Sequence, residues 1–156
     1  MLRVGTVGTS SIMRTIQEAI RLTDGMECRV VYSRTEEQGR AFAAEMGVPE
    51  HCTDYAAMLE RSDLDLIDIA SPNRFHAEQA LAALEHGKHV IVEKPAAVTR
   101  GDVQRLIDAA RANGVYFFEA ITTLFMPQYE ACRLLLPKLG RIEQAHITYA
   151  QYSSRY

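Results

Sequence analysis

The amino-acid sequence predicts an α/β fold: a doubly wound parallel sheet covered by helices on both faces. Short apolar runs rich in β-branched residues alternate along the chain with amphipathic segments of helical period. Such alternation is typical of parallel sheets. Glycine or proline follows most of the apolar runs, where the chain must turn. The 156 residues, 47% of them hydrophobic, suit one packed domain and at most part of a second.

Apolar, β-branched runs predict the strands. The first run ends at Gly8, and the most apolar run is followed by the turn sequence Ser71-Pro72-Asn73. The strands expected on this basis cover residues 2–7, 28–32, 64–70, 89–92 and 115–118.

Apolar residues at helical spacing, with charged residues between them, predict the helices. Gly47 and Gly87 each follow such a segment and supply its stop. Asp54 and Thr99 stand where N-cap residues are needed. The helices expected cover residues 12–22, 36–46, 55–59, 76–85 and 102–112. Right-handed crossovers then give a doubly wound sheet, in which ligands bind beyond the carboxyl ends of the strands.

The last part of the chain follows a different pattern. A helix opened by proline is predicted over 127–136, and residues 142–152 alternate partly, as a final strand does. We place the domain boundary near 120–126. The first domain then covers residues 1–120, and residues 121–156 begin a second, incomplete α/β domain. Because a final strand with no neighbour leaves an unprotected edge, we expect a homo-oligomer.

Charge and cysteine content argue against several classes of function. A net charge of -3 does not suit a protein that grips nucleic acid or an anionic membrane surface. No apolar run approaches transmembrane length, and the chain enters a strand at once, which leaves no room for a signal peptide. Cys28, Cys52 and Cys132 lie far apart, so we expect neither a disulfide framework nor a metal site, and a cytoplasmic setting.

Gly8 lies where the first strand turns into the first helix. The helix N-terminus, at Ser11 and Ile12, offers free N–H groups and the positive end of the helix dipole to a pyrophosphate. The usual Gly-x-Gly-x-x-Gly fingerprint is incomplete, because Ser10 and Met13 occupy its second and third glycine positions. We expect the Ser10 hydroxyl still to contact phosphate and Met13 to impair helix packing. The alternative is a strand–helix turn without a ligand.

Ser33 and Arg34 follow the second strand, where nucleotide domains that prefer NAD usually carry an acidic residue for the ribose diol. A guanidinium is suited instead to a 2′-phosphate. This pair therefore favours NADP over NAD. The alternative is that Arg34 is a solvated loop charge.

Two further turns carry polar groups at strand ends. In the turn Ser71-Pro72-Asn73 the asparagine can donate and accept toward a ribose or an amide, and the alternative is a helix N-cap. In Glu93-Lys94-Pro95 the lysine would polarise a substrate oxygen or relay its proton during hydride transfer, while Glu93 holds the lysine or a ribose hydroxyl. A cis bond before Pro95 is compatible with this turn. The alternative here is a solvent-facing ion pair.

Taken in order, these motifs resemble those of the Gfo/Idh/MocA oxidoreductases, the family of glucose–fructose oxidoreductase and inositol dehydrogenase, with dihydrodiol dehydrogenases as relatives. The resemblance covers essentially the whole chain. It rests on the segment from Gly5 to Ser10, on Ser33-Arg34, on residues 69–73 with His76 just beyond, and on the segment from Gly87 through Glu93-Lys94-Pro95. Glu93-Lys94-Pro95 is the most specific of these marks.

The resemblance implies a Rossmann domain that binds NAD(P), followed by an α/β domain with a large open sheet that forms part of the substrate site and the oligomer interface. It implies that Lys94 and Glu93 are catalytic. The residues implied to bind the cofactor are Gly8, Ser10, Ser11, Ile12, Ser33, Arg34, Ser71, Pro72, Asn73, His76, Glu93 and Lys94. The family's second catalytic motif, an Asp followed by a His, has no counterpart in these 156 residues.

Two functions remain open at this point, beside the possibility of a stable fragment with no activity of its own. The first is an NAD(P)-dependent dehydrogenase or reductase that acts on a small sugar, polyol or diol, represented here by its cofactor domain and inactive by itself. The second is a non-catalytic nucleotide-binding or regulatory module on the same fold, because fold alone does not decide function.

Overall fold

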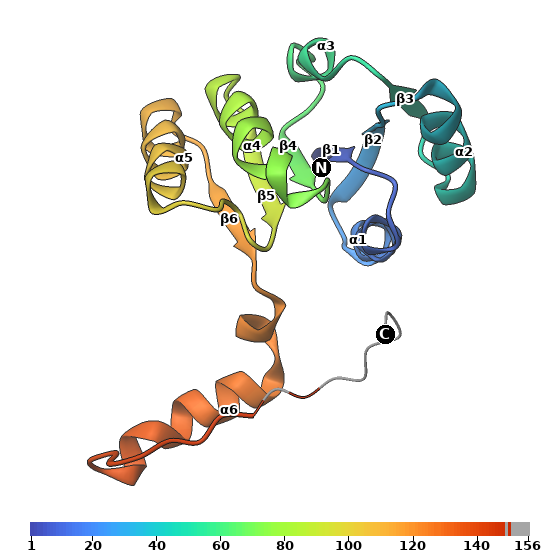
Figure 1. Cartoon of the computed structure of the whole chain (residues 1–156). Helices are drawn as coiled ribbons and strands as arrows, with labels where there is room; N and C mark the ends of the chain where they lie inside the picture. Colours follow the sequence, from blue (N-terminus) through green and yellow to red (C-terminus); the bar gives the residue numbers. More distant parts are fainter. Residues whose placement is uncertain (149, 151–156) are drawn as a thin grey trace. The chain divides into compact units, whose positions relative to one another are not determined.

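The computed structural model describes residues 1–148 and 150, and its main feature is a six-stranded parallel sheet (Figure 1). The strand order is β3-β2-β1-β4-β5-β6, and each neighbouring pair is parallel. Successive strands therefore proceed first to one side of β1 and then, after β3, to the other side. The strands are β1 (Leu2–Val7), β2 (Met26–Tyr32), β3 (Glu50–Cys52), β4 (Leu66–Ile69), β5 (His89–Glu93) and β6 (Phe117–Ala120).

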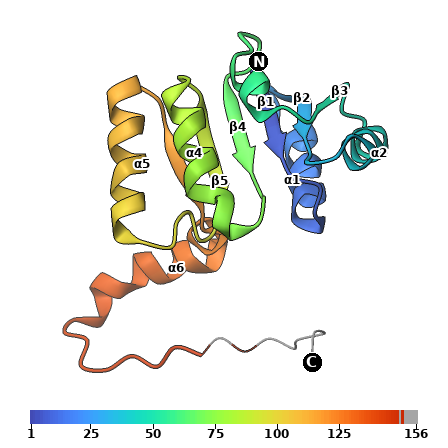
Figure 2. The same cartoon turned by 45° about the horizontal axis from the view of Figure 1, so that its top comes forward.

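Helices connect the strands and cover the two faces of the sheet. In Figures 1 and 2, α1 lies on one face, and α4 and α5 lie side by side on the other. The helices are α1 (Ser11–Leu22), α2 (Glu36–Met46), α3 (Tyr55–Leu59), α4 (His76–Glu85), α5 (Arg100–Asn113) and α6 (Pro127–Leu135). Short 3₁₀ turns cover Asn73–Phe75, Thr122–Phe125 and Leu136–Leu139.

The core is divided by the sheet, because successive side chains of a strand point to opposite faces. On one face, Val7, Ile69 and Val92 pack with Leu84 of α4 and Leu106 of α5 in one buried cluster. On the other face, Val4 and Leu66 pack against Ile20 of α1. This double coverage explains why the central strands are apolar runs without a polar face.

Local capping sets the helix boundaries. Thr35 and Asp54 cap α2 and α3 by accepting backbone N–H bonds through their side chains, and Thr99 does the same for α5. Gly47 and Gly114 end α2 and α5 in the left-handed conformation. The caps that the sequence offers at 54 and 99 and the stop at Gly47 are therefore confirmed.

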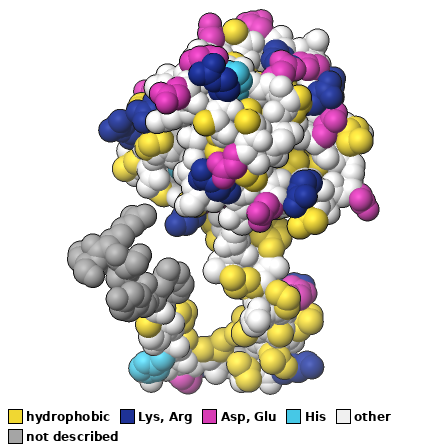
Figure 3. Space-filling view, turned by 90° about the vertical axis from the view of Figure 1, so that its right-hand side faces the viewer, with side chains coloured by type: hydrophobic (Ala, Val, Ile, Leu, Met, Phe, Trp, Pro, Cys, Tyr) yellow, Lys and Arg dark blue, Asp and Glu magenta, His cyan; other side chains and the backbone are white. Residues whose placement is uncertain are grey.

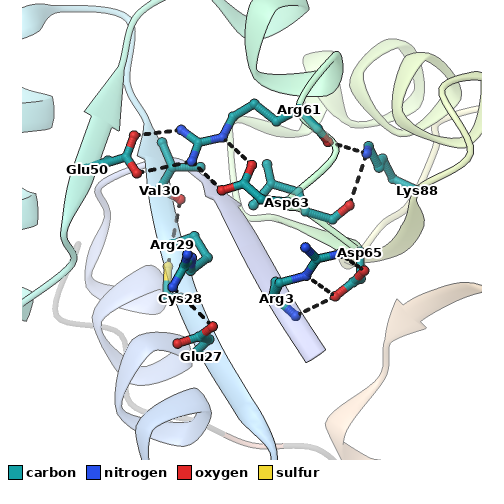
Figure 4. A network of polar contacts seen from close by, with 11 residues as sticks. Arg3, Glu27, Cys28, Arg29, Val30, Glu50, Arg61, Asp63, Asp65 and Lys88 are labelled. Atoms are coloured by element: carbon teal, nitrogen blue, oxygen red, sulfur yellow. Dashed lines mark hydrogen bonds and ion pairs between the residues drawn. The ribbon is translucent and has the colours of Figure 1, made fainter. Parts of the chain in front are cut away.

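A network of charges joins the loops at the amino ends of the strands (Figure 4). Lys88 is buried, and its Nζ donates to the backbone carbonyls of Arg61 at 2.6 Å and Leu64 at 3.0 Å. The Arg61 guanidinium binds Glu50 and Asp63. These bonds fix the loop that leads from α3 into β4, at the edge of the sheet away from the carboxyl ends.

The predicted fold class is confirmed, and the structure corrects several boundaries. The three-residue strand β3 was not predicted, because Glu-His-Cys has no apolar alternation and its pairing with β2 alone makes it a strand. Strand β6 begins at Phe117, two residues later than expected, and α5 begins at Arg100, two residues earlier. Residues 73–75 form a 3₁₀ turn that precedes α4.

The final strand expected over 142–152 is absent from the part of it that the structure describes. Residues 142–148 and 150 carry no regular secondary structure, and positions 149, 151 and 152 lie outside the described residues. Alternation of side chains gives a strand only when a neighbouring strand supplies hydrogen bonds. Within the described residues beyond 120, none does.

The chain divides into two compact units, Met1–Ala120 and Ile121–Tyr156. In the second unit, proline opens α6, and many apolar side chains are exposed (Figure 3). Phe125, Leu134 and Leu139 are among the exposed apolar residues. No helix in the described part of either unit combines the length and apolar composition that crossing a membrane requires.

Strand β1 is joined to the loop before β4 by one ion pair whose contribution can be tested. Asp65 accepts hydrogen bonds from the backbone N–H of Arg3 at 2.8 Å and from its guanidinium at 2.9 and 2.6 Å. These bonds hold the pKa of the Asp65 carboxyl well below its usual range. A lowered pKa in the folded state gives stability above about pH 4, which is lost as the pH falls.

We therefore expect Asp65→Asn to lower the free energy of unfolding by about 1–2 kcal/mol at pH 7, because both side chains are only about one-third exposed. The difference between the two proteins should narrow as the pH falls from about 4 toward 2, because the aspartate is then protonated in the unfolded chain. Urea unfolding followed by circular dichroism, at pH 7 and at about pH 2, measures this difference in the free energy of unfolding. An equal difference at both pH values would show that the ion pair is not the cause.

Candidate functional site

A cavity of about 210 Å³ opens at the carboxyl ends of β1, β2 and β4, all within the first unit. It lies where the order of the strands reverses, which is the place where open α/β sheets bind ligands. Three turns line it. The lining residues are Val7, Gly8, Thr9 and Ser10; Tyr32, Ser33, Arg34 and Gln38; and Ala70, Ser71, Pro72, Phe75 and Gln79.

Gly8 allows two of these turns to approach each other. Its φ of +116° lies in a region that side chains disfavour, and a Cβ built on it would stand 2.9 Å from the carbonyl oxygen of Ala70. The Gly8 N–H donates to the carbonyl of Tyr32 at 3.0 Å. Any larger residue would therefore push the β1–α1 turn away from the β4–α4 turn and open the floor of the cavity.

The N-terminus of α1 stands beside this turn. Ser10 caps the helix, since its hydroxyl oxygen accepts from the Met13 N–H at 3.4 Å, and the first turn of the helix contains no acidic residue. The N–H groups of Ser11 and Ile12 precede the first intrahelical bond and remain donors for an anion. The side chains of Ser11 and Ile12 do not line the cavity; both are exposed.

Met13 does not disturb this arrangement. Its side chain is fully buried and packs with Val31, Phe42 and Val48 in the cluster between α1, β2 and α2. The structure thus fills the third glycine position of the fingerprint with an apolar side chain directed away from the cavity. The expectation that Met13 impairs packing of the helix is wrong for this reason.

The cavity wall carries one positive charge and no negative charge. Arg34 is exposed and makes no ion pair or hydrogen bond among the described residues. The nearby Arg14, by contrast, is bound to both carboxylate oxygens of Glu45 at 2.6 and 2.9 Å. Glu36, at the start of α2, is also engaged, because its carboxylate bonds to His51 and its pKa is lowered by that contact. Arg34 is therefore the cationic group that an anionic ligand would meet.

Several cavity residues were not identified from the sequence. Gln79 holds the β4–α4 turn, as its Oε1 accepts from the Ser71 hydroxyl at 2.6 Å while its backbone carbonyl accepts from the Tyr55 hydroxyl at 2.8 Å. The other lining residues that were missed are Val7, Thr9, Tyr32, Gln38, Ala70 and Phe75. Gln79 lies three residues after His76 in a predicted helix, so helical spacing was the signal available for it.

Besides Ser11 and Ile12, four predicted site residues lie outside this cavity. Asn73 lines a separate hollow beside Ala77 and Val98. His76 is buried and contacts only backbone carbonyls through its ring nitrogens. Glu93 ends β5 and is half-buried, and Lys94 follows it and is exposed. The solvent-facing ion pair between these last two is not formed, whereas the cis bond between Lys94 and Pro95 is.

Asp68 in β4 is an unusual neighbour of this region. It is only 6% exposed, and its Oδ1 finds no hydrogen-bond partner among the described residues. Burial, together with the charge of Glu93, raises the pKa of Asp68 to about 7. Among the described residues, no group of three or more His, Cys, Asp or Glu side chains is arranged to hold a metal ion.

These residues fit a dinucleotide. The glycine turn without a Cβ, the free N–H groups of α1 and the uncommitted guanidinium of Arg34 match a pyrophosphate and a phosphorylated ribose. Hydroxyl groups of Thr9, Ser10, Ser33 and Ser71 stand around the same space. The carboxyl end of β5, with Glu93 and Lys94, continues along the edge of the same sheet.

Comparison with known proteins agrees with this geometry. Residues 2–121 match the family model described as the GFO_IDH_MocA oxidoreductase family with an NAD-binding Rossmann fold. A scyllo-inositol 2-dehydrogenase (NADP(+)) of Bacillus subtilis is 36% identical over 100% of this chain and 48% of its own length. A 1,5-anhydro-D-fructose reductase of Ensifer adhaerens is 39% identical over 74% of this chain and 34% of its own.

Among solved structures, a 3-ketoreductase of Actinomadura kijaniata in complex with NADP and TDP-benzene aligns with a TM-score of 0.82 and 31% identity. The alignment covers 88% of this chain and 42% of that one. Biliverdin reductase of Synechocystis, in complex with biliverdin and NADP+, aligns with a TM-score of 0.78 and 30% identity over 90% of this chain and 44% of that one. The chain spans about half the length of the curated relatives it matches most fully.

The buried carboxyl of Asp68 makes a testable contribution to stability. Its pKa of about 7 in the folded state is above the value of about 4 in the unfolded chain. The protonated carboxyl therefore stabilises the fold below about pH 4, and this contribution is lost as the pH rises through about 7.

We expect Asp68→Asn, which cannot ionise, to raise the free energy of unfolding by about 1–3 kcal/mol at pH 8 and to change it little at about pH 4. Urea unfolding at the two pH values measures this, with the exposed Asp24→Asn as the matched control. A stabilisation that is the same at both pH values would refute the assignment.

Proposed function

Because the chain belongs to the Gfo/Idh/MocA family of oxidoreductases with an NAD-binding Rossmann fold, we propose that it is the cofactor-binding part of an NADP-dependent dehydrogenase or reductase. The substrate class is a small sugar, polyol or diol. Relatives named as dehydrogenases or reductases of inositol and anhydrofructose support this class. NAD is the second cofactor to consider.

The observation that carries the NADP preference is the charge of the cavity wall. Arg34 has no partner among the described residues, and no carboxylate lines the cavity that could bind a ribose diol. A planar guanidinium can bind a 2′-phosphate through paired hydrogen bonds. Two relatives named with NADP(+), the inositol dehydrogenase and a D-xylose 1-dehydrogenase of Haloferax volcanii, support the same preference.

Each predicted residue then has a role. Gly8 and Ser10, with the N–H groups of Ser11 and Ile12, hold the pyrophosphate, and Ser33 with Arg34 holds the adenosine end. The remaining cofactor contacts belong to Ser71, Pro72, Asn73, Glu93 and Lys94, of which only Ser71 and Pro72 line the cavity itself. His76, implied by the resemblance to bind the cofactor, is buried with both ring nitrogens on backbone carbonyls and makes no such contact in this proposal.

The catalytic residues in this proposal are Lys94 and Glu93. A nicotinamide cofactor held by these residues would supply the acceptor or donor of the hydride. Lys94 Nζ takes the proton of the substrate hydroxyl in the oxidation and returns it to the carbonyl oxygen in the reduction. Glu93 orients the lysine or a ribose hydroxyl.

The domain organisation is part of the same proposal. Residues 1–120 form the Rossmann NAD(P)-binding domain, and residues 121–156 begin the domain that completes the substrate site. The division into two compact units and the greater length of the relatives support it. We also propose a cytoplasmic protein without a nucleic-acid or membrane partner, supported by its three free cysteines and its net charge of -3.

One observation favours the alternative of a non-catalytic nucleotide-binding module. Lys94 and Glu93 do not line the cavity formed by the first three turns, so nucleotide binding there does not require them. The two functions are distinguished by whether Lys94 is needed for turnover when the chain is joined to a complete second domain.

The NADP preference is tested by replacing Arg34. We expect the chain to bind NADP+ more tightly than NAD+, and Arg34→Ala to weaken NADP+ binding by about 10- to 100-fold while changing NAD+ binding little, because charge-assisted hydrogen bonds to the 2′-phosphate are lost. Isothermal titration calorimetry with both nucleotides measures this.

The matched control is Arg40→Ala, which removes the same charge from the exposed surface of α2 without touching the cavity. An equal loss of NADP+ affinity in both variants would show that the overall electrostatic field of the protein, and not a contact with Arg34, is the cause. Lys94→Ala is expected to spare NADP+ affinity. Absence of binding of either nucleotide at millimolar concentration would contradict the proposed function.

We also propose a homo-oligomer that forms through the C-terminal domain, as the resemblance implies. The expected edge strand does not support it in the described residues, but the exposed apolar side chains of the second unit do. We expect analytical ultracentrifugation of the chain at micromolar concentrations to show dimers or larger species. A monomer at every concentration would overturn this proposal.

A further inference from the structure

The turn that follows Lys94 is held at two consecutive residues by side chains from elsewhere in the first unit. The carbonyl oxygen of Pro95 lies 2.8 Å from Nδ1 of His76. The N–H of Ala96 donates to Oε1 of Glu119 at 2.8 Å. Binding of a cofactor in the cavity requires neither of these two contacts.

His76 links this turn to the cofactor cavity. It is the first residue of α4 and is only 1% exposed. Its Nε2 lies 2.7 Å from the carbonyl oxygen of Ser71, which belongs to the β4–α4 turn that lines the cavity. Carbonyl oxygens only accept hydrogen bonds, so only the imidazole ring can be the donor in these contacts. A ring protonated on both nitrogens can donate to both carbonyls, whereas a neutral ring can donate to one of them.

Glu119 holds the other side of the turn. It lies in β6, where it is paired with Val92 of the neighbouring strand β5, and its side chain is half-buried. A carboxylate that accepts a backbone N–H makes a charge-assisted hydrogen bond, which is stronger than a neutral one. The anchor therefore comes from the strand next to the one that carries Glu93 and Lys94.

The side chain of Lys94 has no such anchor of its own. It is exposed and makes no hydrogen bond or ion pair among the described residues. The carboxylate of Glu93, which is half-buried, makes none among them either. The position of the Lys94 amine is therefore determined by the backbone of this turn, and not by contacts of the side chain. That backbone is fixed by His76 and Glu119.

We propose that His76 and Glu119 are positioning residues, which hold the Lys94 turn at a set place relative to the β4–α4 turn of the cofactor cavity. Neither residue touches the cofactor. His76, implied by the resemblance to contact the cofactor, acts here through the two turns it joins. The meaning of this arrangement for catalysis rests on the proposed role of Lys94, but the arrangement itself is testable without cofactor.

The test uses the 156-residue chain labelled with ¹⁵N and compares Glu119→Ala, Glu119→Gln and His76→Gln with the unchanged protein. The readouts are the heteronuclear NOE of the Lys94 and Ala96 amides without cofactor, and the shift of the Lys94 amide on addition of NADP+. Val98→Ala is the matched control, because it changes an exposed side chain of the same loop.

We expect the Lys94 and Ala96 amides to be ordered in the unchanged protein and mobile on the ps–ns timescale in Glu119→Ala and His76→Gln. Glu119→Gln should restore order, since its amide oxygen still accepts the Ala96 N–H. NADP+ affinity of Glu119→Ala should stay within about twofold of the unchanged protein, because the residue lies outside the cavity, while the Lys94 amide loses most of its response.

Three results would overturn the inference. The first is an ordered Lys94 amide in both Glu119→Ala and His76→Gln. The second is failure of Glu119→Gln to restore order. The third is loss of the dispersed spectrum in Glu119→Ala, which would make Glu119 a residue of the fold. If the unchanged protein does not bind NADP+, the proposed function fails, whereas the NOE comparison still decides the role of the two residues.

Discussion

The close approach of Gly8 to the carbonyl of Ala70 is the constraint on which the site depends. At 2.9 Å, the space left for a Cβ is smaller than a methyl group needs, so the β1–α1 and β4–α4 turns meet only because position 8 has no side chain. The reversal of strand order places these turns at the same edge of the sheet. Gly8 and Ala70 both line the cavity, and Ser10, the N-cap of α1, lines it beside them.

The two edges of the sheet differ in how their charges are used. At the amino edge, Arg3, Arg61 and Lys88 all have partners, and the bonds tie loops to strands. At the carboxyl edge, Arg34 and Lys94 have no partners among the described residues. A charge already paired within the fold offers little to a ligand, whereas an unpaired one can bind it. The distribution of ion pairs thus separates the edge of the sheet that these bonds stabilise from the edge where we propose that the cofactor binds.

The candidate site was only partly predictable from the sequence. Turn residues directly after strands, such as Gly8, Ser33 and Ser71, were found because parallel strands carry their carboxyl ends to one edge. Gln79 and Phe75 were missed because they reach the cavity from beyond the turn, from α4 and the 3₁₀ turn before it. His76 was placed by resemblance at the cofactor, yet its ring is buried between two backbone carbonyls. Spacing along the chain does not reveal which way a buried ring points.

By itself, the sequence determined the parallel α/β fold, most helix boundaries and the turns that form the site. These follow from local chemistry: apolar period, capping side chains and glycine at left-handed positions. Only the tertiary structure decided the pairing of the polar strand β3, the burial of Met13 away from the cavity and the absence of regular structure over residues 142–148. Each depends on a neighbour distant in the sequence, since hydrogen bonds between strands and contacts between helices are made by whichever segments the fold brings together.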